Sequence, residues 1–462
     1  MSARPLRFAP LAAAAWLAAG CSMMPAYERP PAPVPGDWPY AAAPAGTPAD
    51  ALAWQSFFGD ARLRELIGIA LRNNRDLRVA MLNIEQARAQ YDIRNADRFP
   101  TVNAAVAGSR TPAADGGTNK AYTAGLAVTA WEIDFFGRVA SLGEAALAQY
   151  LGTEEGRKAA QVSLVAAVAA TWLSLVADDE LLALTRQTLA TREESLRLTR
   201  LRFDNGAASE LDFRQAQSLF EGARVALAQQ QRLRAQDLNA LALLLGEPVP
   251  ASLQAPPTLA SLALPDLPAG TPSDVLARRP DVRQAEQQLI AANANIGAAR
   301  AAFFPRITLT AGVGTASSQL SELFQGGSWG WTVAPQLLAP IFDAGRNRAG
   351  LRSANVSRDI AVAQYEKAIQ SAFREVSDAL AGRATLGEQL QAQANVAEAE
   401  AVRFRLSQLR YDNGVSSYLD LLDAQRSLFA ARQALIQTRL AQLQNQVLLY
   451  RALGGGWGTT SP

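Results

Sequence analysis

Two carboxylates, Asp420 and Asp423, are the residues whose type and spacing are best suited to chemistry. They stand three positions apart, which places both on one face of a helix. Paired carboxylates can act as acid and base in glycoside hydrolysis, but no pair of acids here has a sequence context that would form a cleft. The chain has 0 His and 1 Cys, so it lacks the usual general base and the commonest metal ligands. We therefore expect no enzyme activity, no metal site and no bound cofactor.

The composition is that of a folded protein without a strong charge. Of 462 residues, 49% are hydrophobic, and the 44 basic and 42 acidic residues leave a formal charge of +2. Such a balance gives no general attraction to nucleic acid. We expect no nucleic-acid partner.

The N-terminus predicts export. Residues 1–20 combine two early arginines with a short apolar run, which is typical of a signal peptide. The only cysteine, Cys21, follows at once, and this site resembles a bacterial lipobox, where the cysteine receives diacylglycerol and an N-acyl chain such as palmitate. By the same resemblance to bacterial lipoproteins, Ser22 in place of Asp implies export to the outer membrane and not retention in the inner one. The alternative is a secreted protein with an incidental free cysteine.

The body of the chain repeats itself. Leu201–Gly206 reads Leu-Arg-Phe-Asp-Asn-Gly and returns at Leu409–Gly414 as Leu-Arg-Tyr-Asp-Asn-Gly, while a Phe-Pro pair occurs at Phe99 and again at Phe304. A repeat of this length indicates two structural units. The predicted organisation is a signal peptide (1–20), an anchor with a Pro-rich tether (21–54), a first repeat (55–250), a linker (251–272), a second repeat (273–453) and a tail (454–462).

Each repeat predicts the same order of elements. An amphipathic helix ends before Phe-Pro, a strand pair follows, and a very long helix ends at Asp-Asn-Gly, after which a partner helix returns as an antiparallel hairpin. The predicted helices are 60–97, 138–204 and 209–245 in the first repeat and 273–302, 345–411 and 416–453 in the second.

The predicted strands alternate apolar residues with small or polar ones. They cover 101–109, 121–131, 306–314 and 329–338. In the second of them, Val128 and Ala130 fall on the apolar face. This pattern is typical of membrane strands with lipid on one side and water on the other, although a soluble sandwich alternates too. The export signal, the lack of further strands and the aromatic residues at strand ends favour the membrane. The expected aromatic girdle comprises Trp131, Trp329, Trp331 and Phe324.

Four strands cannot close a barrel, and an open edge in hydrocarbon leaves backbone groups unpaired. We therefore expect a barrel shared between chains. Two copies would give eight strands with hardly any lumen, whereas three copies would give twelve.

Together the lipobox, the tandem repeat, the Phe-Pro pairs and the segment Tyr411–Arg426 (YDNGVSSYLDLLDAQR) resemble the TolC family. The similarity covers nearly the whole mature chain and is closest to the OprM-like lipoprotein branch. It implies an α+β membrane protein, a homotrimer with a twelve-stranded outer-membrane β-barrel and a long periplasmic α-barrel. The implied function is a passive efflux conduit, associated with multidrug resistance, that docks with a periplasmic adaptor and an inner-membrane pump, commonly of the RND type.

The resemblance also assigns a periplasmic gate. Asp420 and Asp423 match the constricting aspartates, Tyr411 and Asp212 match a hydrogen-bonded pair between hairpins, Leu419 matches an apolar ring and Arg410 a basic gate residue. In the repeat, Asp423 aligns with Gln215. Only the second hairpin carries the double carboxylate, which favours it as the inner one.

Three alternatives stay open from the sequence. The chain could be the outer-membrane channel of a type I secretion system, or a periplasmic coiled-coil adaptor or structural lipoprotein. The aspartates could also be solvated acids on a helix face.

Overall fold

The computed structural model describes residues 22–40, 48–114, 116–253 and 257–457. The predicted signal peptide and Cys21 lie outside these residues. The chain forms two compact units, and each draws on both repeats. The first contains the described residues up to Pro31, with Leu82–Glu155 and Arg283–Lys367; the second contains Ala32–Met81, Gly156–Val282 and the described residues from Ala368 onward.

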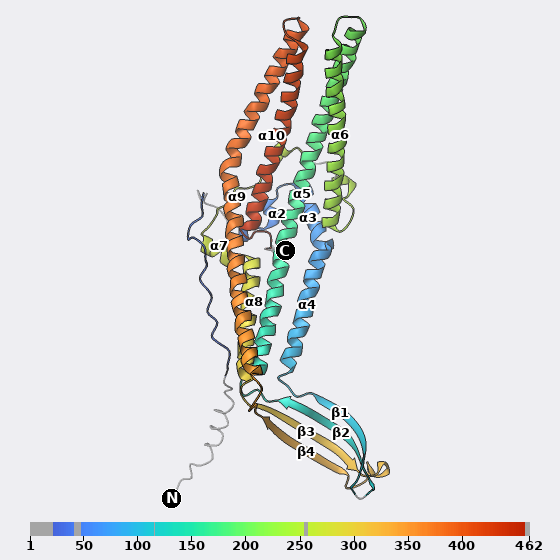
Figure 1. Cartoon of the computed structure of the whole chain (residues 1–462), viewed down its shortest axis with the longest axis vertical. Helices are drawn as coiled ribbons and strands as arrows, with labels where there is room; N and C mark the ends of the chain where they lie inside the picture. The colour runs from blue at the N-terminus through green and yellow to red at the C-terminus, as the bar shows by residue number, and fades with distance from the viewer. Residues whose placement is uncertain (1–21, 41–47, 115, 254–256, 458–462) are drawn as a thin grey trace. The chain divides into compact units, whose positions relative to one another are not determined.

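The first unit contains a four-stranded antiparallel sheet with the order β1-β2-β3-β4 (Figure 1). Its strands are β1 (Val102–Pro112), β2 (Thr118–Glu132), β3 (Arg306–Ser317) and β4 (Trp329–Leu338). The predicted strand pairs are confirmed. Because β2 pairs with β3, the two repeats meet in the middle of one sheet.

One face of the sheet is apolar across all four strands. Trp331 lies opposite Val313, Val313 opposite Leu126, and Leu126 opposite Ala104. Directly opposed residues share a face, so these four side chains form one apolar row. Both Leu126 and Trp331 are exposed. The predicted alternation is therefore present, with its apolar side chains on the outside of the unit.

A β-bulge changes the prediction at the end of β2. Val128 lies opposite Ala311, but the next paired residue is Trp131, opposite Leu309, so two residues of β2 face one residue of β3. Ala130 has a positive φ of 50°, and its N–H donates to Thr310 Oγ1 at 3.3 Å. The expectation that Ala130 continues the apolar face is wrong, because the extra residue moves Trp131 onto that face.

A row of residues without large side chains crosses the same sheet. Gly125 lies opposite Gly314, which lies opposite Gly330. A Cβ on Gly125 would come within 2.3 Å of the Val313 carbonyl oxygen, and one on Gly314 within 2.3 Å of the Ala124 oxygen. The two central strands can approach this closely only because both positions are glycine.

The long helical hairpins are confirmed with nearly the predicted bounds. They are α5 (Arg138–Asp204) with α6 (Glu210–Leu245), and α9 (Arg346–Asp412) with α10 (Tyr418–Ala452). A helix of 67 residues, such as α5, has a length of about 100 Å. Within the described residues, only α5 contains a stretch that is long and apolar enough to cross a membrane, and most of that stretch is buried in the protein. We assign it to the helical core.

The first helix of each repeat is broken, which the sequence did not predict. The observed pairs are α3 (Ala61–Asn73) with α4 (Arg75–Ala96), and α7 (Pro272–Arg278) with α8 (Pro280–Ala301). Asn74 is extended and its side chain accepts from the Leu77 N–H at 2.9 Å, so it caps a new helix. Arg279 is extended because Pro280 follows it. The remaining short helices are η1 (Ala49–Ala51), α2 (Trp54–Phe57), η2 (Ala251–Leu253), η3 (Leu259–Ser261) and η4 (Leu320–Glu322).

The core of the second unit joins α2 to the end of α10. The Tyr450 ring stacks on Phe57 at 4.0 Å between centroids, and its hydroxyl donates to the Leu52 carbonyl at 2.6 Å. Nearby, the buried Arg279 pairs with Asp281 at 2.7 Å and Glu375 at 2.9 Å. A buried guanidinium needs such partners, so this pair of carboxylates fixes α9 against the α7–α8 break.

Candidate functional site

The predicted site lies at the ends of the two hairpins, where the turns have the same geometry. Gly206 and Gly414 both have a φ of 71°, in the left-handed region that glycine adopts most easily. The N–H of Ala207 donates to the Arg202 carbonyl at 2.7 Å, and that of Val415 donates to the Arg410 carbonyl at 2.8 Å. The repeated Asp-Asn-Gly motif therefore ends both long helices in the same way.

Asp420 begins α10. Its carboxylate accepts from the Ser417 N–H at 3.1 Å and the Ser417 hydroxyl at 2.9 Å, while its own N–H donates to Ser417 Oγ at 3.2 Å. This reciprocal arrangement is a capping box. Asp212 forms the same box with Ser209 at the start of α6. Both aspartates therefore have a structural role that the spacing argument missed.

Asp423 has a different environment. It forms an ion pair with Arg403 of α9, and Arg426 lies 3.7 Å away on α10. Arg403 also pairs with Glu400 at 3.1 Å, and its hydrogen bond to Asp423 is the main cause of the raised pKa of the Arg403 guanidinium. Both partners of the Arg403–Asp423 pair are nearly half exposed, so the pair itself stabilises the fold by about 0–1 kcal/mol. Neither arginine was predicted as part of the site.

The two hairpins enclose a groove that brings together three of the predicted residues, Leu419, Asp420 and Asp423. A groove of about 450 Å³ is lined by Gln215, Ser218, Leu219, Leu419, Asp420, Leu422, Asp423 and Arg426. Leu419 is exposed. Gln215, the residue that aligns with Asp423 in the repeat, therefore faces the same groove from α6, with its Oε1 buried and without a hydrogen-bond partner among the described residues.

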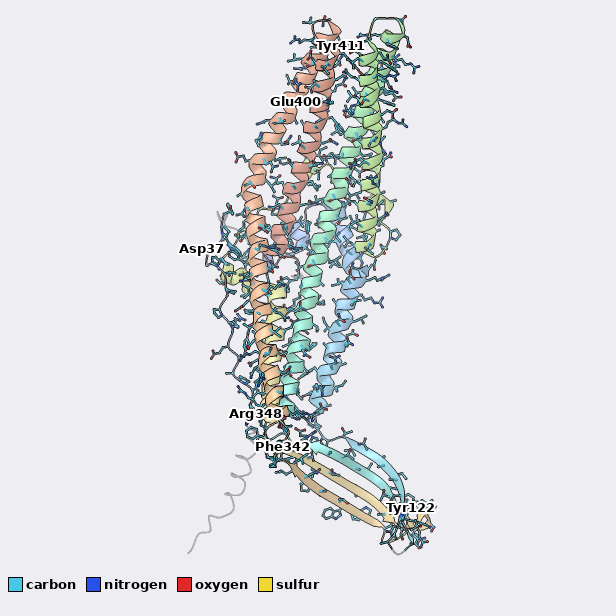
Figure 2. The ribbon with its side chains drawn as sticks, in the orientation of Figure 1. Asp37, Tyr122, Phe342, Arg348, Glu400 and Tyr411 are labelled. Carbon is cyan, nitrogen blue, oxygen red and sulfur yellow. The ribbon has the colours of Figure 1, made fainter. Side chains whose placement is uncertain are left out.

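Tyr411 has a different partner from the one that the resemblance implied. Its hydroxyl accepts a hydrogen bond from Arg202 of α5, and the Arg202 guanidinium lies 5.3 Å from the Tyr411 ring centroid. Among the described residues no hydrogen bond joins Tyr411 to Asp212, whose carboxylate accepts from the Ser209 N–H and hydroxyl through Oδ2. Burial is the main cause of the raised pKa of Tyr411, and the Asp212 charge adds to it. Tyr411 still joins the two hairpins near their ends (Figure 2).

Tyr418 provides a second link between the hairpins, which the sequence did not reveal. Its hydroxyl and the Ser195 hydroxyl of α5 are 2.7 Å apart. Its buried ring packs with Ala216, Leu421 and Leu422. The predicted basic residue, Arg410, is exposed on α9 and does not join this cluster.

The predicted aromatic girdle divides between two ends of the sheet. Trp329 and Trp331 lie opposite Thr315 and Val313, near the end marked by Tyr122 in Figure 2. The exposed Phe324 lies in the connection from β3 to β4 at the same end. Trp131 lies opposite Leu309, at least four residues away along β3, which corresponds to about 13 Å. The four residues therefore form two groups.

Within the described parts of the chain, no group of three or more His, Cys, Asp or Glu side chains is placed to hold a metal ion.

Comparison with known proteins identifies the family. The profile of the family described as OEP, outer membrane efflux protein, matches residues 66–247 and 271–455. Two curated relatives from Pseudomonas putida, the probable efflux pump outer membrane protein TtgC and the antibiotic efflux pump outer membrane protein ArpC, are each 50% identical over 459 residues, which covers 97% of this chain and 95% of theirs.

A solved structure gives the same result. The open state of the MtrE outer membrane channel of Neisseria gonorrhoeae is 41% identical, with a TM-score of 0.88 over 95% of this chain and 99% of that one. The four-stranded sheet and the long hairpins thus have the fold of an outer-membrane channel. The chain belongs to the outer membrane efflux protein family, as an outer-membrane channel subunit of a tripartite efflux system with a large periplasmic part.

Proposed function

We propose that three copies of this chain form a passive conduit that is closed at its periplasmic end by Asp423 and opened by an adaptor protein. The observation that carries the proposal is the ion-paired Asp423 in a groove shared by both hairpins. Around a threefold axis, three such carboxylates would converge, and the arginine partners within each chain would reduce the repulsion between them.

The sheet supports the shared barrel. Within the described residues, β1 and β4 each have a strand on one side only. Each unpaired backbone group in hydrocarbon would cost several kcal/mol, so the edges need partners from other copies. Twelve strands from three chains leave a lumen, whereas eight would be filled by side chains. Cross-linking of cysteines placed on β1 and β4 tests this, and the result expected is a covalent trimer in outer-membrane fractions.

Conductance tests the gate. In a planar bilayer, Asp423→Ala should raise the small resting conductance several-fold and weaken its preference for cations, because the carboxylates that narrow the closed end and attract cations are removed. Asp420→Ala is a poor partner for this test, since it removes one half of the capping box at the start of α10, which costs on the order of 1 kcal/mol. Glu221→Ala, which removes an exposed carboxylate paired with Arg224 on α6, is the matched control. Equal conductance and selectivity in Asp423→Ala and the wild type would refute the gate.

The segment that follows Cys21 supports lipidation there. It lies along α8: the Pro25 carbonyl accepts from Asn293 at 2.9 Å, the Met23 carbonyl from Arg300 at 3.4 Å, and Arg29 pairs with Glu286 at 2.6 Å. A Cβ on Gly297 would come within 2.9 Å of Met24 Cα, so the fit is close. The chain is thereby directed toward the α8 end that precedes β3, where an acyl chain would reach the bilayer. Labelling with palmitate that persists in Cys21→Ser would exclude this site.

The proposed partners of the channel are a periplasmic adaptor and an inner-membrane pump. Photo-crosslinkers placed in the turns at 204–210 and 412–417 should capture an adaptor in intact cells. The names of the relatives favour export of drugs and small molecules over protein secretion. Deletion of the gene for this chain should therefore abolish drug resistance and leave protein secretion intact.

A further inference from the structure

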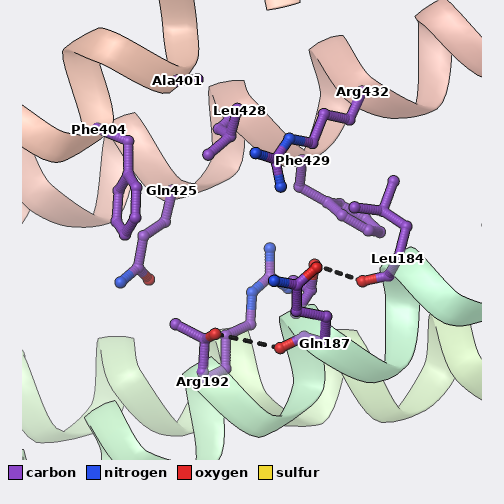
Figure 3. A pocket seen from close by; sticks show the side chains of 11 residues that line it. Leu184, Gln187, Arg192, Ala401, Phe404, Gln425, Leu428, Phe429 and Arg432 are labelled. Carbon is purple, nitrogen blue, oxygen red and sulfur yellow. Dashed lines mark hydrogen bonds between the residues drawn. The ribbon is translucent and has the colours of Figure 1, made fainter.

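A cavity of about 210 Å³ lies between α5 of one hairpin and α9 and α10 of the other. Two arginines from different hairpins, Arg192 and Arg432, line it together (Figure 3). Figure 3 shows their guanidinium groups directed toward one another across the cavity. The two like charges make this cavity unlike the groove that holds Asp423.

Arg192 is buried, and no carboxylate pairs with it in the part of the chain that the structure describes. It is 8% exposed, its Nη1 donates to the Leu219 carbonyl at 3.1 Å, and its Nε is buried without a hydrogen-bond partner among the described residues. Burial, followed by the positive charge of Arg426, lowers its pKa. A buried guanidinium normally pairs with a carboxylate or with several hydrogen-bond acceptors. The Nε of Arg192 without a hydrogen bond therefore indicates that an acceptor binds in this cavity.

Arg432, the second arginine of the cavity, adds a positive charge and does not neutralise that of Arg192. Arg432 is exposed, and it has no ion pair within the described residues. Water could accept one bond from Arg192, but it would leave both guanidinium groups of the cavity without a counter-ion. An anion would do both.

The other walls define the kind of anion. The rings of Phe404 and Phe429 line the cavity, and the Arg192 guanidinium lies 5.4 Å from the Phe429 centroid. Gln425 also lines the cavity, and its Nε2 amide group is a donor of the kind that an anion accepts from. The cavity volume of about 210 Å³ is roughly seven times the 30 Å³ that one water molecule occupies in the liquid. The cavity therefore has room for a small aromatic acid.

We propose that this cavity binds a small organic anion, a carboxylate or sulfonate attached to an apolar ring. The acid group lies between Arg192 and Arg432, and the ring packs against Phe404 and Phe429. The bound anion joins α5 to α10 and so links the hairpins at a place separate from the gate. The site does not depend on the proposed gating role of Asp423.

Benzoate is a suitable probe, and benzamide is its neutral analogue. Calorimetric titration of the full channel in lipid nanodiscs, with empty nanodiscs as the blank, should give saturable benzoate binding and at least tenfold weaker benzamide binding. Arg432→Gln should weaken benzoate binding at least tenfold, whereas Arg432→Lys should retain most of it. Arg432 is exposed, so these variants should fold. Arg224→Gln, at an exposed arginine of α6, is the matched control and should bind as the wild type does.

A second variant tests the same geometry without a ligand. Arg432→Glu supplies a carboxylate beside Arg192, so it should raise the unfolding temperature and abolish the further rise that benzoate causes in the wild type. The proposal is overturned if benzamide binds as tightly as benzoate, if Arg432→Gln binds benzoate normally, or if no saturable binding occurs, in which case the cavity holds water only.

Discussion

Arg403 of α9 and Asp423 of α10 form an ion pair across the second hairpin. Arg403→Gln removes this partner and leaves Asp423 with Arg426 alone, at 3.7 Å. The pair is nearly half exposed, so the fold should lose no more than about 1 kcal/mol. In a trimer, however, the less neutralised carboxylates repel by about 1–4 kcal/mol per pair if they lie about 4 Å apart. We expect a several-fold rise in bilayer conductance.

Arg197→Gln is the control for this variant, because Arg197 pairs with Glu194 on its own helix at 2.6 Å. It removes the same charge near the same end of the hairpins. A rise of equal size in both variants would show that net charge, and not the Asp423 contact, sets the conductance.

The Arg403–Asp423 contact could have been predicted. Both residues lie ten positions from Asn413, on opposite sides of the turn. Residues equidistant from the turn of an antiparallel hairpin face each other. In the first hairpin, Asp179 and Arg234 pair at 26 and 29 positions from Asn205, so the rule holds there only approximately. The Tyr411–Arg202 contact could not be found in this way, since it joins two hairpins whose relative rotation depends on packing.

Stability should fall as the pH rises from about 4 to about 6 because of Asp178. Burial between α5 and α6 is the main cause that raises its pKa to about 6, although a hydrogen bond from Gln230 at 2.7 Å lowers it; the charges of Asp237 and Asp179 raise it further. The folded state therefore holds a proton that the unfolded state releases near pH 4. The sign follows: the stabilisation is complete below the unfolded pKa and is lost as the pH passes the folded pKa.

Asp178→Asn should flatten this dependence and stabilise the protein above pH 6 by on the order of 2–3 kcal/mol. Chemical unfolding of the channel at pH 4, 5, 6 and 7.5 measures it. Asp412→Asn, at an exposed carboxylate of α9, should leave the slope unchanged. If the free energy of unfolding does not fall between pH 4 and 6 relative to Asp178→Asn, the raised pKa of Asp178 is contradicted.

Alternation of residue types predicted the sheet, but not its bulge. A bulge inserts one residue, and a sequence read with a strict period of two places Ala130 on the face where Trp131 lies. Nothing in the types of Thr129 and Ala130 marks the extra residue. The left-handed φ of Ala130 is stabilised by the Thr310 hydroxyl from the other repeat, so it depends on the pairing of β2 with β3.

Gly314→Ala should prevent assembly of the sheet. The new Cβ would lie 2.3 Å from the Ala124 carbonyl oxygen and 2.6 Å from Gly125 Cα, and backbone atoms of a paired strand cannot move aside. Outer-membrane fractionation and native electrophoresis should show less trimer. On the same strand, a Cβ at Gly312 would meet nothing closer than 3.5 Å, so Gly312→Ala should assemble normally. Equal assembly of the two variants would show that the strands can separate at Gly125.

The Ser195–Tyr418 hydrogen bond should contribute to closure of the hairpins, because it joins α5 to α10 at 2.7 Å beside the packed ring of Tyr418. Tyr418→Phe keeps the ring and removes the hydroxyl, which should cost about 0.5–1.5 kcal/mol. Ser195→Ala removes the other partner, and the double variant should cost less than the sum, as expected for one shared bond. Tyr150→Phe is the control, since that hydroxyl donates to Glu154 on the same helix at 2.7 Å. Chemical unfolding measures the coupling energy between the two positions, and bilayer recordings measure the resting conductance. Additive costs with an unchanged resting conductance would mean that the bond does not hold the hairpins together.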